Sequence, residues 1–203
     1  SEMCIRDSFQ PWTGGGMHFA FFNQPVAAGK NYQMFVAALK PLLQDHQEAM
    51  TRLESLEEGF KATMQEALDS MWQRKLGLVD HSPELVGELL QLCVDSAADY
   101  TMVFRELSAI PEQLGPLKRS FYRPSDHQID QRWMNWLQGW RRQLEHNSDL
   151  SETSRAMQLA NPAMTWREWL IAPAYEQAAH GDYSLVHEPV SYTHLTLPTS
   201  HNV

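Results

Sequence analysis

The sequence predicts an all-α fold of six or seven helices. Apolar residues recur at steps of three and four from about residue 27 to residue 188, which is the spacing of one helix face. Helix-start and helix-stop signals such as Ser82-Pro83 and Gly77 separate these segments. Outside residues 190–197, the sequence has no alternating β-branched run of strand length. Together these observations favour helices packed on helices.

The first predicted helix follows Asn23-Gln24-Pro25 and ends at Leu43, and the second spans about 47–75. Proline suits a first helical turn because the N–H that it lacks would have no intrahelical partner there. Gly77 is expected to stop the second helix. The apolar positions are Met34, Val36, Leu39, Leu42 and Leu43, followed by Met50, Leu53, Leu56, Phe60, Met64, Leu68, Met71 and Trp72.

Ser82-Pro83-Glu84 combines a capping serine, a first-turn proline and an acidic residue near the positive helix N-terminus, so it predicts the next helix start. Its buried face is expected to contain Leu85, Leu89, Leu92 and Cys93. A short helix is predicted around 100–107, followed by a loop over 111–124 that is rich in proline.

Ser125 and Gln128 have the spacing of a capping box and predict a further helix. Asn161-Pro162 is expected to begin the last helix, which ends near His180-Gly181 because glycine favours the position after a helix. The apolar side of the helix that follows Ser125 consists of Ile129, Trp133, Trp136, Leu137, Trp140 and Leu144.

The chain of 203 residues has 16 basic and 25 acidic side chains, a net charge of −9, with 43% hydrophobic residues. This is the composition of a globular protein, and its acidity argues against nucleic acid as a partner. An apolar run of transmembrane length is absent, so no membrane partner is expected. The only cysteines, Cys4 and Cys93, cannot form a disulfide framework, which predicts a reducing, cytoplasmic location.

We divide the chain into four segments. Residues 1–8 are interpreted as a non-native leader and 189–203 as a non-native tail. Residues 9–26 are expected to form an irregular segment, and residues 27–188 a helical domain. The alternative for the two ends is native, disordered termini.

Four groups of residues are candidate sites. His46 and His187 lack a second histidine at metal-ligand spacing, and Gly29-Lys30 lacks the glycine and the serine or threonine of a phosphate-binding loop. The tryptophan stripe at 133, 136 and 140 fits a base-stacking or sugar-stacking surface, but its spacing fits a buried helix face better. Cys93 is expected to act as a small buried hydrophobe rather than a nucleophile.

Four ordered blocks of the sequence resemble the C-terminal half of the selenoprotein O (YdiU) family of kinase-like proteins. They are Phe21-Phe22-Asn23-Gln24-Pro25 with the helix ending at Leu43, Lys75-Leu76-Gly77-Leu78, Ala98-Asp99-Tyr100-Thr101 with Phe104-Arg105, and Asn161-Pro162 with Arg167 and Gly181-Asp182-Tyr183. The resemblance covers about residues 19–188. It departs from the family pattern at Met17-His18-Phe19 and at Lys30.

The resemblance implies the C-terminal helical portion of a protein-kinase-like fold, from a pseudokinase that transfers AMP from ATP to Ser, Thr or Tyr hydroxyls of proteins. It implies ATP and Mg or Mn as cofactors of the full-length parent, and protein substrates and the missing N-terminal kinase-like portion as partners. The family's catalytic and metal-binding residues precede the block at Asn23, and its redox residue lies beyond Glu188. No catalytic, cofactor-binding or metal residue is therefore expected in this chain, nor a cofactor bound to it alone.

Two other hypotheses remain open. The chain fits a stand-alone all-α interaction module without catalysis, because it has seven tryptophans and tryptophan is a residue type that often anchors interfaces. A haem or metal protein that uses the nine histidines is the weaker alternative.

Overall fold

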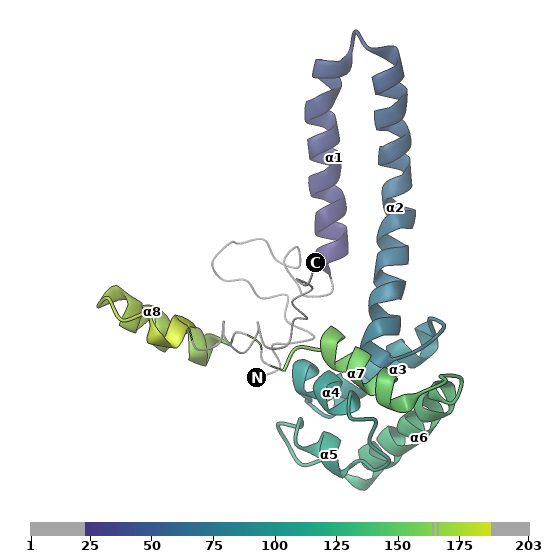
Figure 1. Cartoon of the computed structure of the whole chain (residues 1–203), viewed down its shortest axis with the longest axis vertical. Coiled ribbons are helices and arrows are strands. Elements are labelled where there is room, and N and C mark those ends of the chain that lie inside the picture. Colours follow the sequence, from purple (N-terminus) through teal and green to yellow (C-terminus); the bar gives the residue numbers. More distant parts are fainter. Residues whose placement is uncertain (1–22, 164, 166, 188–203) are drawn as a thin grey trace, which may run out of the picture. The chain divides into compact units, whose positions relative to one another are not determined.

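The computed structural model describes residues 23–163, 165 and 167–187, and within them every regular element is an α-helix. An isolated bridge between Ala98 and Phe121 is the sole β-type pairing in these residues, so the all-α prediction is confirmed. The helices (Figure 1) are α1 (Gln24–Leu43), α2 (Gln47–Leu76), α3 (Pro83–Asp95), α4 (Tyr100–Leu107), α5 (Gly115–Lys118), α6 (His127–Leu144), α7 (Leu150–Ala160) and α8 (Glu168–Ala179).

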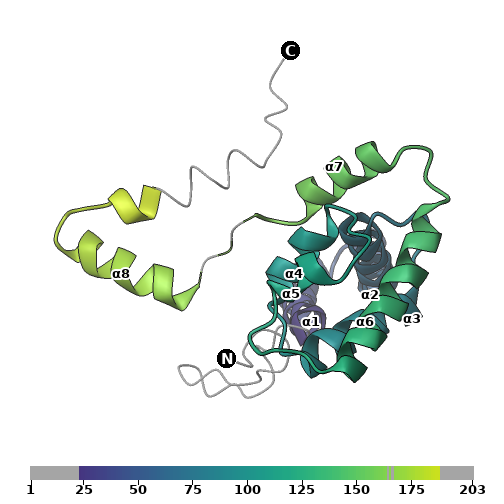
Figure 2. The ribbon, with the colours of Figure 1, turned by 90° about the horizontal axis from the view of Figure 1, so that it is seen from below.

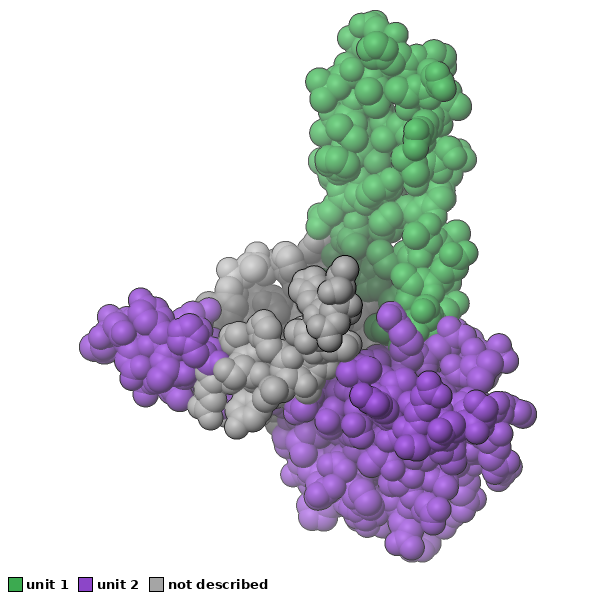
Figure 3. All heavy atoms as spheres, in the orientation of Figure 1, with its two compact units in different colours: residues 1–71 green, residues 72–203 purple. Residues whose placement is uncertain are grey.

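The predicted domain over 27–188 is divided into two compact units, residues 1–71 and 72–203 (Figure 3). Helix α1 begins at Gln24, so residues 24–26 of the segment expected to be irregular over 9–26 are helical. No described helix combines the length and apolar character needed to cross a membrane. The proposed leader, which includes Cys4, and the proposed tail lie outside the described residues.

In the first unit, α1 and α2 form a helical hairpin (Figure 1). The rings of Tyr32 and Phe60 stack at a centroid distance of 4.7 Å, and Lys40 pairs with Glu57 at 3.0 Å. A Cβ at Gly29 would lie only 3.3 Å from the Phe60 ring, so the missing side chain allows the two helices to approach closely here.

The apolar positions predicted for these two helices are not all buried. Val36 and Leu53 are buried, but Met34 is 73% exposed and Leu42 is 74% exposed. Two paired helices share one seam, and apolar residues on any other face have nothing to contact within the hairpin. Periodicity therefore predicted the helices correctly, but only the structure shows which of their apolar side chains are exposed.

The second unit has its core between α3 and α6, which pack against each other (Figure 2). All four residues predicted for the buried face of α3 are buried. On α6, the rings of Trp136 and Trp140 stack at 5.7 Å, and Trp133 meets Trp136 edge-on at 6.1 Å. The three tryptophans are buried, so the core interpretation of this stripe is confirmed over a stacking surface.

The same tryptophans fasten α6 to the rest of the unit. Their indole N–H groups donate to the Ser96 hydroxyl, the Leu85 carbonyl and the Leu76 carbonyl at 3.3, 2.9 and 2.8 Å, respectively. A buried N–H without an acceptor would be costly, and here each N–H has one.

Several helix boundaries differ from the predictions. The predicted loop over 111–124 contains the short helix α5, because proline is tolerated in a first turn. Asp126, not Ser125, caps α6 by accepting from the Ile129 N–H at 2.8 Å, while Ser125 donates to Asp130. The positive φ angles of Gly77 (68°) and Gly181 (87°) confirm both predicted glycine stops.

The largest error concerns Asn161. It was predicted to begin the last helix, but it ends α7, a helix that the sequence analysis did not separate. Helix α8 starts only at Glu168, with Arg167 at its N-cap. Helix α7 is capped instead by Asp149, which accepts from the Ser151 and Glu152 N–H groups.

Candidate functional site

Three of the sequence blocks that carry the family resemblance converge in the second unit. Lys75 comes from the end of α2, Asp99 from the start of α4, and Asn161 and Arg167 from the segment after α7. Their polar groups form two adjoining clusters, one around Asn161 and one around Asp99. The geometry of each cluster shows what it is able to do.

Asn161 is fully buried and uses its whole side-chain amide. The amide nitrogen donates to the Lys75 carbonyl at 2.8 Å and to the Ser108 hydroxyl at 3.0 Å. The amide oxygen accepts from Lys75 Nζ at 2.9 Å. Because a side chain must both donate and accept here, asparagine suits this position, and it fastens the end of α7 to the end of α2.

The ammonium group of Lys75 is held between this amide and two aromatic rings. Its Nζ lies 4.7 Å from the Phe104 ring centroid and 5.6 Å from that of Tyr100. Burial lowers the pKa of Lys75 from 10.5 to about 8. A lysine with such a pKa is suited to act as a base or nucleophile, but its contacts here hold it in a structural position.

The Asp99 carboxylate is the centre of the second cluster and is 2% exposed. It caps α4 by accepting from the Met102 N–H at 3.0 Å, and it accepts from the Tyr122 hydroxyl at 2.6 Å. Arg167 adds a charged pair, with Nη2 donating to Oδ1 at 2.7 Å and Nη1 lying 2.5 Å from Oδ2. The guanidinium thus forms a bidentate pair with the carboxylate.

Electrostatics favours the ionised form of both partners. Burial on its own would raise the pKa of Asp99, but the hydrogen bonds from Arg167, Tyr122 and the Met102 N–H outweigh it and lower the pKa. The hydrogen bond to Asp99 raises the pKa of Arg167. A carboxylate held in this way is a poor proton acceptor, so the cluster is suited to fixing the segment before α8 rather than to acid–base chemistry.

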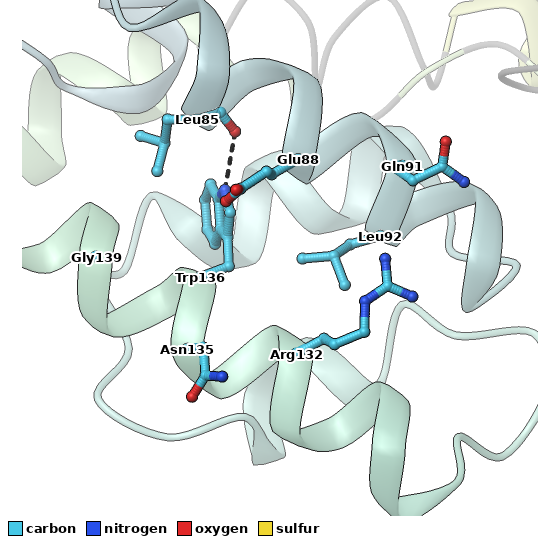
Figure 4. Close-up of a pocket in the computed structure, with 8 residues that line it drawn as sticks. All are labelled: Leu85, Glu88, Gln91, Leu92, Arg132, Asn135, Trp136 and Gly139. Atoms are coloured by element: carbon cyan, nitrogen blue, oxygen red, sulfur yellow. Dashed lines mark hydrogen bonds between the residues drawn. The ribbon is translucent and has the colours of Figure 1, made fainter.

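A groove of about 360 Å³ lies between α3 and α6 (Figure 4). Leu85, Leu92 and Trp136 form its apolar floor, and Glu88 and Arg132 stand on opposite walls. Because Trp136 already donates to the Leu85 carbonyl, the floor has no unsatisfied indole N–H.

The structure also places the residues weighed as candidate sites. His46 lies in the turn between α1 and α2, and Gly29-Lys30 lies inside α1, which excludes a phosphate-binding loop there. Cys93 is buried, and burial raises the pKa of its thiol to about 12, as expected of a small hydrophobe. In the described residues, no three His, Cys, Asp or Glu side chains gather as a metal site would require. That this chain has no catalytic residue stays a prediction.

Lys75, Asp99, Asn161 and Arg167 belong to the sequence motifs, but the motifs do not show which of them are in contact, and Ser108 and Tyr122 belong to no motif. One signal was available. Asn161 and Asp99 are polar residues next to helices that bury apolar side chains such as Met157 and Phe104, and a buried amide or carboxylate must have partners. The identity of those partners, up to 86 residues away in the chain, has no local signature.

Comparison with known proteins agrees with the motif blocks. A family model described as protein adenylyltransferase SelO matches residues 13–193. A protein nucleotidyltransferase YdiU from Nitrosococcus oceani is 32% identical over 178 residues, which cover 84% of this chain and 34% of that protein. The protein of the same name from Methylorubrum populi is 30% identical over 174 residues, 79% of this chain and 34% of the relative. The chain thus spans about a third of the length of these curated relatives.

Proposed function

This chain belongs to the protein adenylyltransferase SelO family, and on that premise we propose that it is the C-terminal helical portion of an enzyme that transfers AMP from ATP to Ser, Thr or Tyr hydroxyls of proteins. The observation that carries the proposal is the family match over residues 13–193. The chain also covers only about a third of the length of its relatives, as expected of one portion of a larger protein. The partners of this portion are then the N-terminal kinase-like part of the parent and, through it, the protein substrates.

The role proposed for this portion is to buttress the catalytic lobe. The residues that the family resemblance singles out make buried structural contacts, from Lys75 to Asn161 and from Asp99 to Arg167. Exposed apolar side chains on the α1–α2 hairpin, including Met34, Phe35 and Leu42, offer a surface for another part of the parent to cover. The acidic composition and the absence of a disulfide framework favour a cytoplasmic location.

Transfer of AMP requires cationic groups and a divalent metal, Mg or Mn in this proposal, to neutralise the triphosphate of ATP. The donors in the described residues do not fit that requirement, because their carboxylates and histidines do not gather in groups of three or more. The buried cations Lys75 and Arg167 are already bound to Asn161 and Asp99. We therefore assign no step of the reaction to this chain and propose that the nucleotide site lies elsewhere in the parent.

The proposal is tested on the parent protein. The reading frame upstream of Phe9 is recovered, the continuous protein is expressed, and it is incubated with Mg or Mn and candidate proteins. Label from ATP carrying ³²P at the α-phosphate is expected on protein, whereas label at the γ-phosphate is not. Transfer of the γ-phosphate alone would contradict nucleotidyl transfer. For this chain by itself, calorimetry is expected to show no ATP binding, and saturable binding would overturn the placement of the nucleotide site.

The same exposed apolar face favours one alternative, a stand-alone all-α interaction module. The upstream reading frame distinguishes the two. A kinase-like Asp-Tyr-Gly-Pro segment there supports the enzyme, and an initiator methionine with a promoter immediately before residue 9 supports the module.

A further inference from the structure

We propose that the side of α1 that faces away from α2 is covered in the parent protein by the kinase-like portion that precedes Asn23, which makes α1 a core helix of the parent with partners on both sides. The inference rests on the proposed function and sharpens it, because it assigns the contact to one face of one helix.

Helix α1 has apolar residues on two sides. On the side toward α2, the Tyr32 ring stacks on Phe60 and Val36 is buried. A second apolar stripe at helical spacing lies on the opposite side, and its three large side chains are 60% to 74% exposed. A helix that is apolar on both sides is typical of a protein interior. The residues of this outer stripe are Met34, Phe35, Ala38 and Leu42.

The outer side of α2 has the opposite character. Covering it would take the carboxylates of Glu58 and Glu66 out of water, which is costly without a partner for each. Helix α1 has only two charged residues, Lys30 and Lys40, and neither belongs to the outer stripe. Of the two helices, α1 is therefore the one suited to be covered. The exposed residues on the outer side of α2 are Ser55, Glu58, Ala62, Gln65 and Glu66.

The area of the outer stripe argues against a second copy of the chain as the occupant. Helix α1 has 20 residues, so it is about 30 Å long and about 10 Å wide. One of its faces offers roughly 300 Å² of surface. Two copies joined through this face would bury about 600 Å² in total, whereas a specific, stable interface needs about 1,200 Å².

A partner on the same polypeptide needs less area, because the chain itself holds it at a high local concentration. The relatives are long enough to supply such a partner, since the part of the Nitrosococcus oceani protein that matches this chain is only 34% of its length. The proposed function puts the kinase-like portion directly before α1. That portion is therefore the occupant that the area of the stripe favours.

The test compares the labelling of introduced thiols in the 203-residue chain and in the parent. Ala38→Cys places a thiol in the outer stripe, and Ala62→Cys is its matched control, because Ala62 is also an exposed alanine inside a helix. In the chain alone, both thiols are expected to react with a maleimide at similar rates. In the parent, the thiol at position 38 should react at least about tenfold more slowly, and the thiol at position 62 should keep its rate. Mass spectrometry of peptides distinguishes both from native cysteines.

Thermal unfolding gives a second, independent measurement. In the chain alone, Ala38→Glu and Ala62→Glu both change an exposed helical position, so each should shift the midpoint by less than about 2 °C. In the parent, Ala38→Glu places a carboxylate under the covering portion and should lower the midpoint by more than about 3 °C. Ala62→Glu should have little effect there as well.

The inference is overturned if position 38 reacts equally fast in the chain and the parent, if both positions are protected in the parent, or if the two glutamate variants affect the parent equally. It is also overturned if labelling at position 38 in the chain alone slows as the protein concentration rises, because a second copy then covers the stripe. None of these measurements uses ATP. A parent that protects position 38 but transfers phosphate rather than AMP would therefore contradict the proposed reaction and support this contact.

Discussion

The guanidinium group of Arg167 holds the buried carboxylate of Asp99 in a bidentate pair, with N–O distances of 2.5 and 2.7 Å between residues 68 positions apart. The pair joins the cap of α4 to the residue that begins α8. Its side chains are only 15% and 3% exposed, so water screens the interaction little.

Arg167→Ala is expected to lower the free energy of unfolding by about 3 kcal/mol, because it leaves a buried carboxylate without its cation. Urea unfolding followed by circular dichroism measures the change. Arg119→Ala is the matched control, since Arg119 pairs with Glu106 at 2.7 Å but its side chain is 69% exposed. That control should cost less than about 1 kcal/mol. Equal losses in the two variants would show that the buried pair contributes no more to the free energy of unfolding than the exposed pair does.

The same pair predicts a pH dependence. The hydrogen bonds that outweigh burial hold the pKa of Asp99 below its ordinary value of 3.8 in the folded state. Its stabilising contribution is therefore complete above that value and is lost as the pH falls through the lower folded pKa. Urea unfolding at a series of pH values from neutral to strongly acidic should show a smaller loss of stability in acid for Asp99→Asn than for the unsubstituted chain. An identical acid limb in both proteins would contradict the assignment.

Lys75 should titrate near pH 8. Burial lowers its pKa from 10.5 to about 8, so the folded state disfavours its charge below pH 8, and this cost is relieved as the pH rises from 8 toward 10.5. NMR of ¹³Cε-labelled lysine from pH 6 to pH 11 should show one resonance with a midpoint near 8. That resonance is expected to vanish in Lys75→Met, and a resonance of Lys75 with an unshifted midpoint would refute the prediction.

Gly77→Ala is expected to destabilise the protein by more than about 1 kcal/mol. Gly77 has a φ of 68°, and an added Cβ would approach Met157 Sδ and Thr153 Cγ2 to 2.7 Å. Gly59→Ala provides the opposite case, because Gly59 lies inside α2 with open space around its Cβ position. It should stabilise the protein by about 0.5–1 kcal/mol through helix propensity. Thermal unfolding compares the two, and a stabilised Gly77→Ala would disprove the strain argument.

Cys93 should be inert in the folded protein. It is buried, and burial raises the pKa of its thiol to about 12, so neither access nor ionisation favours reaction. In a Cys4→Ser variant, a chromogenic disulfide reagent is expected to detect no thiol within minutes under native conditions and one thiol in urea. Rapid reaction of the native variant would show that α3 opens readily.

Apolar spacing, together with the start and stop signals that flank it, predicted α1–α4 and α6, because a helix that buries one face must repeat apolar residues every three to four positions. Asn161 was misplaced for a physical reason. The Asn-Pro pair is consistent with a helix start, and only its buried hydrogen bonds to Lys75 and Ser108 show that it ends a helix instead. Asp126 was similarly overlooked beside Ser125, since both residue types cap helices.

By itself, the sequence determined the all-α class, the buried tryptophan face of α6 and the family resemblance, because these depend on spacing and order along the chain. Only the tertiary structure decided that Lys75 meets Asn161 and that Asp99 meets Arg167. Such contacts join residues far apart in sequence. Because a buried polar group finds its partner through the path of the whole backbone, local patterns do not encode that partner.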